Sequence, residues 1–191
     1  MDFKKHFETA WGLTLKFIVP LILMTIVLFI VGFVTLGILA PVATAGYMQS
    51  LLLLLKEGRE PKVQDIFSEM RLFLPLLLFG FAIFIATLIG FTLLILPGIL
   101  VLLFISFCCL YVLPLMTDKN MELIEAVKES YRLSVRGNIV DQVVTVILFW
   151  GITAIGSSVF IGWLFTQPLA TIILLSVYTE KTSQIVQNST S

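Results

Sequence analysis

The sequence has little charge, and long stretches of it have none. Only 13% of the 191 residues are Asp, Glu, Lys or Arg, whereas 59% are hydrophobic. A soluble domain has about 25% charged and about 45–50% apolar residues, so this composition indicates a membrane protein. The formal net charge is zero, and no cluster of Lys and Arg alternates with aromatic residues as in nucleic-acid-binding proteins. We therefore expect a lipid bilayer, and no nucleic acid, as a partner.

Cysteine and histidine are scarce as well. The two cysteines, Cys108 and Cys109, are neighbours in an apolar run, without the spacing of metal ligands or of a disulfide framework. We interpret them as small side chains that fill space in a helix. The single histidine, His6, has no acid or base partner that the sequence identifies, and we expect it in water or among lipid headgroups. The sequence predicts no metal site and no cofactor.

The motifs that accompany catalysis are also missing. The sequence contains no His-Glu-x-x-His and no Gly-x-Ser-x-Gly, and no Asp or Glu lies deep in an apolar stretch. An enzyme needs a nucleophile with a base, a pair of carboxylates or a metal site. Serines and threonines in the apolar stretches are more simply explained by bonds back to their own helix. We predict that the protein is not an enzyme.

What the sequence does have is three charge-free blocks. Residues 17–55, 72–117 and 142–179 are 39, 46 and 38 residues long, and all 24 charged residues lie outside them. A membrane-spanning helix needs about 20 residues, so each block is long enough for two. Turn-forming residues stand near the middle of each block: Gly37 and Pro41, Pro97 and Gly98, and the segment 156–162. The sequence predicts an all-α integral membrane protein with six transmembrane helices in three hairpins.

The positions of the charges predict the orientation. All Lys and Arg residues flank the blocks on one side, which the positive-inside rule makes cytoplasmic. We expect a multi-pass protein of the cytoplasmic (inner or plasma) membrane with both termini in the cytoplasm. Residues 1–46 contain an apolar core longer than the roughly 7–15 residues of a signal peptide, so we expect a span rather than a cleaved leader. If the turn is at Pro41, only 15 residues of the first block remain, Pro41 included, so the second span is either short or re-entrant.

The charged segment 120–138 has the pattern of an amphipathic helix. Its charges recur every three or four residues, with acids before bases, which suits a helix dipole; they are Glu122, Glu125, Glu129, Arg132 and Arg136. Gly137 is expected to end the helix. Lys128, Arg132 and Arg136 are candidate contacts for lipid phosphates, each base contributing about 1 kcal/mol near an anionic surface. Because neighbouring acids offset that field, bracing of the hairpins at the membrane surface is the alternative.

This segment has counterparts elsewhere in the chain. Residues 10–16 align with residues 130–136 at an offset of 120, so that small, aromatic and basic residues coincide. Lys16 and Pro20 have the same spacing as Arg71 and Pro75. We predict one domain, residues 1–191, in which a short interfacial amphipathic helix precedes each hairpin, the second of them near residues 63–69. The internal repeats are residues 1–57, 58–118 and 119–181.

The polar side chains within the charge-free blocks include Gln49, Ser50, Ser106 and Gln167. They are candidates for the path of an uncharged or lipid-like solute, and Pro41 and Pro168 are candidates for the helix breaks that carriers use. Ion-coupled carriers usually keep ionisable groups at mid-membrane depth, and these blocks have none. The alternative is that the four side chains form hydrogen bonds between helices.

Leu96-Pro97-Gly98, one span, and then Ala126-x-x-x-Ser130-x-x-Leu133-x-x-Arg136-Gly137 form a pattern that resembles a group of bacterial and archaeal six-span membrane proteins. The group includes the YciC-type proteins and the membrane domain attached to some glycerophosphodiester phosphodiesterases. The resemblance covers essentially the whole chain, although the family has Lys-Gly where this chain has Arg136-Gly137. It implies a fold and not a reaction, because the hydrolase domain of some relatives is not part of this sequence.

Two functional hypotheses follow. The first is a non-enzymatic, accessory or lipid-interacting protein of envelope homeostasis, which rests on the resemblance and on the missing catalytic groups. The alternative is a carrier or channel for an uncharged or amphipathic, lipid-like solute. A homo-oligomer or a membrane-protein partner is compatible with both.

Overall fold

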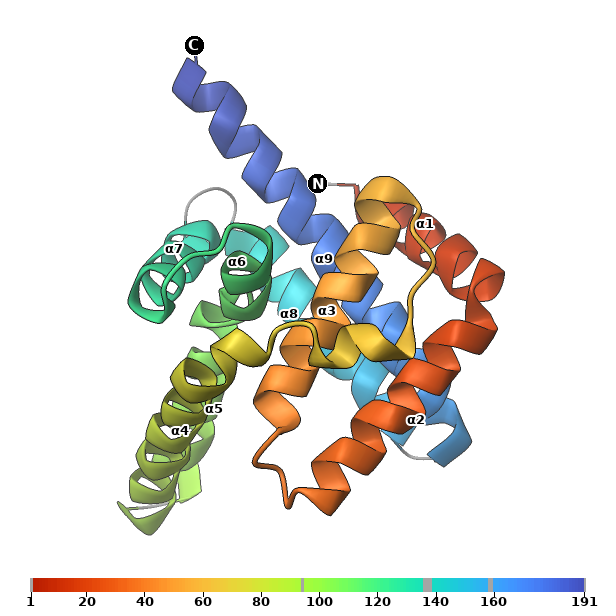
Figure 1. Cartoon of the computed structure of the whole chain (residues 1–191). Coiled ribbons are helices and arrows are strands. Elements are labelled where there is room, and N and C mark those ends of the chain that lie inside the picture. Colours follow the sequence, from red (N-terminus) through yellow and green to blue (C-terminus); the bar gives the residue numbers. More distant parts are fainter. Residues whose placement is uncertain (1, 94, 136–138, 158–159, 191) are drawn as a thin grey trace.

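The computed structural model describes residues 2–93, 95–135, 139–157 and 160–190, which are helical apart from short connections (Figure 1). The described part is therefore all-α, as the sequence predicts. In chain order the elements are α1 (Phe3–Lys16), α2 (Ile18–Val34), α3 (Ala40–Glu57), the 3₁₀ helices η1 (Val63–Phe67) and η2 (Met70–Leu72), α4 (Phe73–Leu93), α5 (Ile95–Cys108), α6 (Val112–Asp118), α7 (Leu123–Val135), α8 (Ile139–Ser157) and α9 (Phe160–Thr190).

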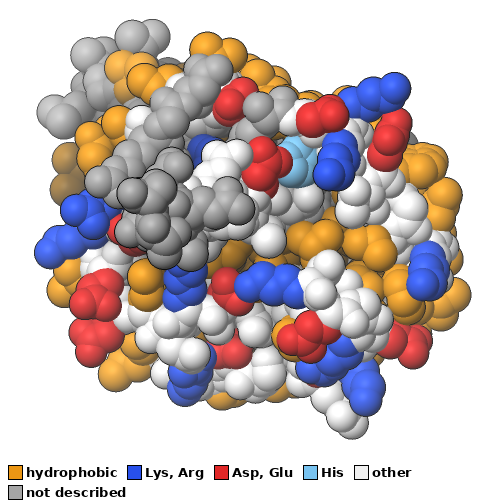
Figure 2. All heavy atoms as spheres, turned by 90° about the horizontal axis from the view of Figure 1, so that it is seen from above, with side chains coloured by type: hydrophobic (Ala, Val, Ile, Leu, Met, Phe, Trp, Pro, Cys, Tyr) orange, Lys and Arg blue, Asp and Glu red, His pale blue; other side chains and the backbone are white. Residues whose placement is uncertain are grey.

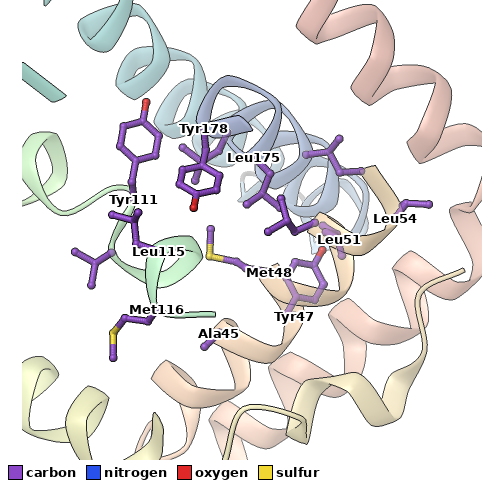
Figure 3. Close-up of a cluster of buried hydrophobic side chains, with 14 of the residues drawn as sticks. Ala45, Tyr47, Met48, Leu51, Leu54, Tyr111, Leu115, Met116, Leu175 and Tyr178 are labelled. Atoms are coloured by element: carbon purple, nitrogen blue, oxygen red, sulfur yellow. The ribbon is translucent and has the colours of Figure 1, made fainter. Parts of the chain in front are cut away.

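Helices α3 and α9 form the centre of the molecule. They contact each other, and α9 also contacts α1, α2 and α8. Side chains from α3, α9 and α6 meet in the core (Figure 3), where Tyr47, Leu51 and Leu175 are fully buried. The hydroxyl of Tyr47 lies 3.2 Å from Thr25 Oγ1 on α2, so the polar end of this buried ring has a partner. Helix α3, which is less apolar than most of the expected spans, is thus surrounded by protein.

Residues 35–39 reverse the chain between α2 and α3. Leu36 and Gly37 have φ angles of 51° and 83°, in the left-handed region that glycine adopts readily. Pro41 follows in the first turn of α3, where its missing N–H would have had no partner in the helix. The chain therefore reverses at Gly37 and Pro41, the turn-forming residues in the middle of the first charge-free block.

The segment after α3 folds back along it. In η1 the backbone crosses α3 at Gly46, where a Cβ atom would overlap the carbonyl group of Ile66. Ser50 Oγ donates to Asp65 Oδ2 at 2.7 Å, and Arg59 donates to Asp65 Oδ1 at 2.6 Å. The short surface helix predicted near residues 63–69 is therefore a pair of 3₁₀ helices, and η1 packs against the middle of α3.

Helices α4 and α5 pack against each other as a hairpin. Their backbones approach closely at two glycines, since a Cβ atom on Gly90 would lie 3.0 Å from Gly98 Cα. Because α5 begins at Ile95, Pro97 and Gly98 lie in its first turn, and the connection between the helices comes before them. Proline is well tolerated at such a position; the side chain of Pro97 lies outside the described part.

The fourth predicted span lies within Gly98–Asp118, a segment long and apolar enough to cross a membrane as one span. Its α-helical hydrogen bonding is interrupted at residues 109–111, the helix break between α5 and α6. Backbone carbonyls at the break receive hydrogen bonds from α7. Ser130 Oγ donates to the Cys108 carbonyl at 2.6 Å, and Ser134 Oγ donates to the Phe107 carbonyl at 2.8 Å. Freed backbone groups in an apolar span need such partners, so α7 stabilises the break.

The amphipathic segment forms α7, as predicted, and packs mainly through small residues. Its buried side chains are Ala126, Ser130, Leu133 and Ser134. Larger apolar residues point outward, with Ile124 68% and Tyr131 50% exposed. Exposed apolar side chains beside charged ones are typical of a helix at a membrane surface. Arg136 and Gly137 lie outside the described residues.

Among the described residues, four helical segments are long and apolar enough to cross a membrane: Val63–Thr92, Gly98–Asp118, Ile139–Ser157 and Gly162–Gln184. A fifth results if α1 and α2, which meet at 89°, form one bent span. The difference from the predicted six falls on the first hairpin. There α2 has only 17 residues, and α3 includes polar residues and ends with Lys56 and Glu57.

Candidate functional site

Three contacts join charged segments that are far apart in the sequence. Lys56 Nζ, at the end of α3, lies 2.6 Å from Asp118 Oδ1, at the end of α6. Tyr178 OH donates to Asp118 Oδ2 at 3.1 Å, and His6 on α1 contacts Glu180 on α9. We call these five residues the polar layer. They belong to segments whose charged side chains gather on the face seen in Figure 2.

His6 lies between two side chains of α9. It is 7% exposed; its Nδ1 lies 2.7 Å from Ser176 Oγ, and its Nε2 lies 2.8 Å from Glu180 Oε2. The second approach is within ion-pair distance but lacks the alignment of a hydrogen bond. Sequence reasoning missed these partners because Ser176 is 170 residues away. The one available signal is that Ser176 and Glu180 are four residues apart and share a helix face.

Serine, histidine and an acid in this order occur in hydrolases, in which the serine is the nucleophile. Here Ser176 lies in the middle of α9, so its backbone N–H belongs to the helix and does not stabilise an oxyanion. A polar hollow of about 600 Å³ lies beside the group and is also lined by Asp2 and Lys5. The arrangement holds α1 against α9, and the backbone N–H of Ser176 is not available to an oxyanion.

A buried cation of α9 takes part in a second network. Lys181 is 8% exposed, and its Nζ donates to Gln142 Oε1 at 2.5 Å and to the Leu133 carbonyl at 3.2 Å. The same Nζ lies 5.2 Å from the centre of the Tyr111 ring, and Tyr111 OH donates to Gln142 Oε1 at 2.9 Å. Because a buried charge requires such partners, Lys181 ties α9 to α7, to α8 and to the helix break.

An apolar cavity of about 360 Å³ opens beside the helix break. Its walls come from α3, α4, α5, α6 and α8, with one residue of α9. Gly80 leaves space in the α4 wall, since a Cβ atom there would meet only Pro41 Cγ, at 3.9 Å. The hydroxyl of Thr44, another wall residue, donates to the Ala40 carbonyl of its own helix at 2.8 Å. The cavity therefore offers almost entirely apolar contacts.

The structure does not bring the four residues of the predicted polar path together. Ser50 is bonded to Asp65, as described above, and Gln49 Oε1 is buried without a hydrogen-bond partner among the described residues. Ser106 lines the apolar cavity, whereas Gln167 lines a separate hollow of about 390 Å³. Thr44 lines both spaces, so a continuous path would have to pass α3 at this residue.

The predicted contacts for lipid phosphates lie on the exposed side of α7. Lys128 is exposed. Arg132 is 62% exposed, and one of its guanidinium nitrogens lies 3.4 Å from Glu129 Oε2. An exposed pair of this kind contributes at most about 1 kcal/mol. Both described bases thus remain accessible to a phosphate, and Arg136 is not among the described residues.

Comparison of the chain with protein-family models, with curated proteins and with solved structures gives no match.

Proposed function

We propose that the chain is a non-enzymatic, multi-pass protein of the cytoplasmic membrane that acts by interacting with lipids, in an accessory role in envelope homeostasis. Six spans, α2, α3, α4, α5 with α6, α8 and α9, cross the bilayer as three hairpins. Both termini lie in the cytoplasm, and α1 and α7 lie at the inner surface. The resemblance to the six-span families supplies the link to the envelope.

The observation that carries this proposal is the polarity of the molecule. The polar layer joins distant charged segments, whereas α2, α4, α5 and α8 present apolar side chains outward. Each of these helices contributes a large residue that is more than half exposed: Phe33, Phe84, Phe104 and Ile147. Apolar surface that extends over four helices needs an apolar medium, and a bilayer provides one.

Helix α1 adds support for a role at the membrane surface. Its buried residues are His6, Ala10 and Thr14, which follow one another at intervals of four and pack on α9. A second stripe, Phe7, Trp11 and Leu15, is 42–49% exposed. A helix with charged residues and an uncovered apolar stripe suits the boundary between headgroups and acyl chains.

Cysteine labelling tests the orientation. In a background without Cys108 and Cys109, single cysteines at positions 59 and 125 are expected to resist a membrane-impermeant maleimide added from outside. A cysteine at Leu36, which is 90% exposed in the α2–α3 turn, is expected to react and serves as the matched control. Labelling of position 59 or 125 from outside would contradict the orientation.

The second candidate function is a carrier for an uncharged or amphipathic solute. The break between α5 and α6 beside an apolar cavity favours it, because broken helices commonly form the binding sites of carriers. Reconstitution in vesicles distinguishes the two: the accessory role predicts solute flux and lipid scrambling no greater than in protein-free vesicles. Flux that is lost in Gln49→Ala or Gln167→Ala but kept in Arg132→Ala would establish the carrier instead.

A further inference from the structure

We infer that the apolar cavity beside the helix break binds one acyl chain of a membrane lipid. This inference rests on the proposed function, because it requires the wall helices to lie in a bilayer, and it adds the site and the chemical class of the ligand.

The cavity exists because of two local features. The α4 wall lacks a side chain at Gly80, and no atom other than Pro41 Cγ lies near the position where a Cβ atom would be. On the opposite wall the helix break separates Cys109, which follows α5, from Val112 and Leu113 of α6, and all three line the space. The volume of about 360 Å³ exceeds twice the roughly 150 Å³ of an engineered cavity that binds benzene.

The walls select an apolar ligand. Phe79, Ile83, Phe149 and Trp150 supply large apolar surfaces. An ordered water needs two to four polar partners, but the hydroxyl of Thr44 is already bonded within α3. Ser106 alone cannot hold a chain of waters, so hydrocarbon is the better occupant.

The position of the cavity favours a lipid chain over other apolar molecules. The cavity is open on part of its surface, and its wall helices α4, α5 and α8 belong to segments that are long and apolar enough to span a membrane. Leu78 and Phe104 on the outer sides of α4 and α5 are 60% and 64% exposed. The surface around the hairpin is thus apolar, and acyl chains are the most abundant molecules at that depth of a bilayer.

The test uses the full chain purified in detergent, with bound lipid counted by native mass spectrometry. After washing has removed surface lipid, the wild-type protein is expected to retain one phospholipid per chain. Gly80→Leu places a side chain in the cavity and is expected to reduce the retained fraction at least fivefold. Gly151→Leu makes the same change on α8, where nothing lies within 4 Å of the added Cβ, and is expected to retain the lipid.

A second variant and a second measurement keep the test decisive. Ile83→Phe fills the cavity from the next turn of α4 and is expected to act like Gly80→Leu, with circular dichroism showing that both variants are folded. In a protein whose only tryptophan is Trp150, a brominated fatty acid is expected to quench fluorescence saturably, and less so in Gly80→Leu.

Three results would overturn the inference. They are lipid retained by both filled variants at the wild-type level, a wild-type protein that shows neither retained lipid nor saturable quenching, and a wild-type dimer without lipid that the Gly80→Leu substitution dissociates. In the last case a second copy of the chain would cover the cavity. The cysteine-labelling pattern is independent of all three, so failure here is distinguishable from failure of the proposed membrane orientation.

Discussion

Gly46 lets one backbone segment lie directly on another. It stands in α3 among alanine, threonine and tyrosine, where a sequence gives no sign that a carbonyl group will approach. Hydrophobic periodicity reports which side chains seek an apolar environment, whereas the contact with η1 is made by the backbone of Asp65 and Ile66. For this reason the sequence predicts a surface helix near residues 63–69 and misses the crossing.

Replacing Gly46 by alanine is expected to destabilise the protein. The added Cβ would overlap the Ile66 carbonyl, and overpacking of this kind costs about 1–3 kcal/mol, more than the gain of up to about 1 kcal/mol in helix propensity. Unfolding by SDS titration in mixed micelles measures the change. Gly12→Ala is the control, because nothing lies within 4 Å of its added Cβ; this variant is expected to be neutral or slightly stabilised. Equal stability of the two variants would contradict the close approach at Gly46.

The break between α5 and α6 illustrates what can be predicted for a single element. The apolar run from Gly98 to Leu113 contains no charged residue that would suggest an interruption, so the sequence predicts one continuous span. The partners that stabilise the break, Ser130 and Ser134, belong to α7. The amphipathic pattern of α7 is predictable from its own sequence, but the neighbour of its small-residue face is not, because that neighbour is distant in the chain.

Ser130→Ala is expected to lower the free energy of unfolding by about 1–3 kcal/mol, the usual cost of leaving buried polar groups unsatisfied. The Cys108 carbonyl and the Tyr111 N–H both lose their bond to the Ser130 hydroxyl. Ser183→Ala is the matched control, since this exposed hydroxyl only donates to the Glu180 carbonyl of its own helix; we expect a change within about 0.5 kcal/mol. Thermal unfolding in detergent compares the two, and a Ser130→Ala effect as small as the control would argue against α7 as the support of the break.

Helix α1 provides a prediction about docking. Removal of the imidazole in His6→Ala leaves Ser176 and Glu180 without their α1 partner, so α1 is expected to separate from α9 more often. A cysteine at Ala10, which is fully buried, then becomes at least tenfold more reactive toward a water-soluble maleimide, in the background without native cysteines. Lys4→Ala is the control, because Lys4 is exposed and pairs only across 3.8 Å with Glu8. Unchanged reactivity in His6→Ala would mean that Ala10 and Thr14 hold α1 by themselves.

For the whole molecule, block lengths predict roughly how many helices exist, and charge positions predict which ends of helices gather. They do not predict which helices become central. A block of apolar residues is equally suited to contact lipid or protein, because both are apolar. The central position of α3 and α9 depends on contacts such as those of Tyr47 and Tyr178 with side chains of other helices, and these become apparent only in the folded chain.

Asp118 connects three helices of the polar layer, and a pair of variants separates its two contacts. Asp118→Asn removes the charge opposite Lys56 but keeps an acceptor for Tyr178 OH, and we expect a loss of no more than about 1 kcal/mol. Asp118→Ala removes the contacts with both Lys56 and Tyr178. Because the hydroxyl of the buried Tyr178 then lacks an acceptor, we expect the free energy of unfolding to fall further, by about 1–3 kcal/mol. SDS titration measures both. If the alanine and asparagine variants were equally stable, the contact with Tyr178 would contribute nothing to the stability of the protein.

The central position of α9 has a consequence for biosynthesis. Domains emerge from the ribosome in chain order, at about 5–20 residues per second, so α9 is the last of the described helices to be made. Until it arrives, His6 on α1 lacks Ser176 and Glu180, and Asp118 on α6 lacks Tyr178. In the proposed membrane orientation, the earlier helices therefore wait without these contacts to α9 and with a gap at their centre. A nascent chain stopped before α9 would be a natural substrate for membrane quality control, because completion of the last helix closes the bundle.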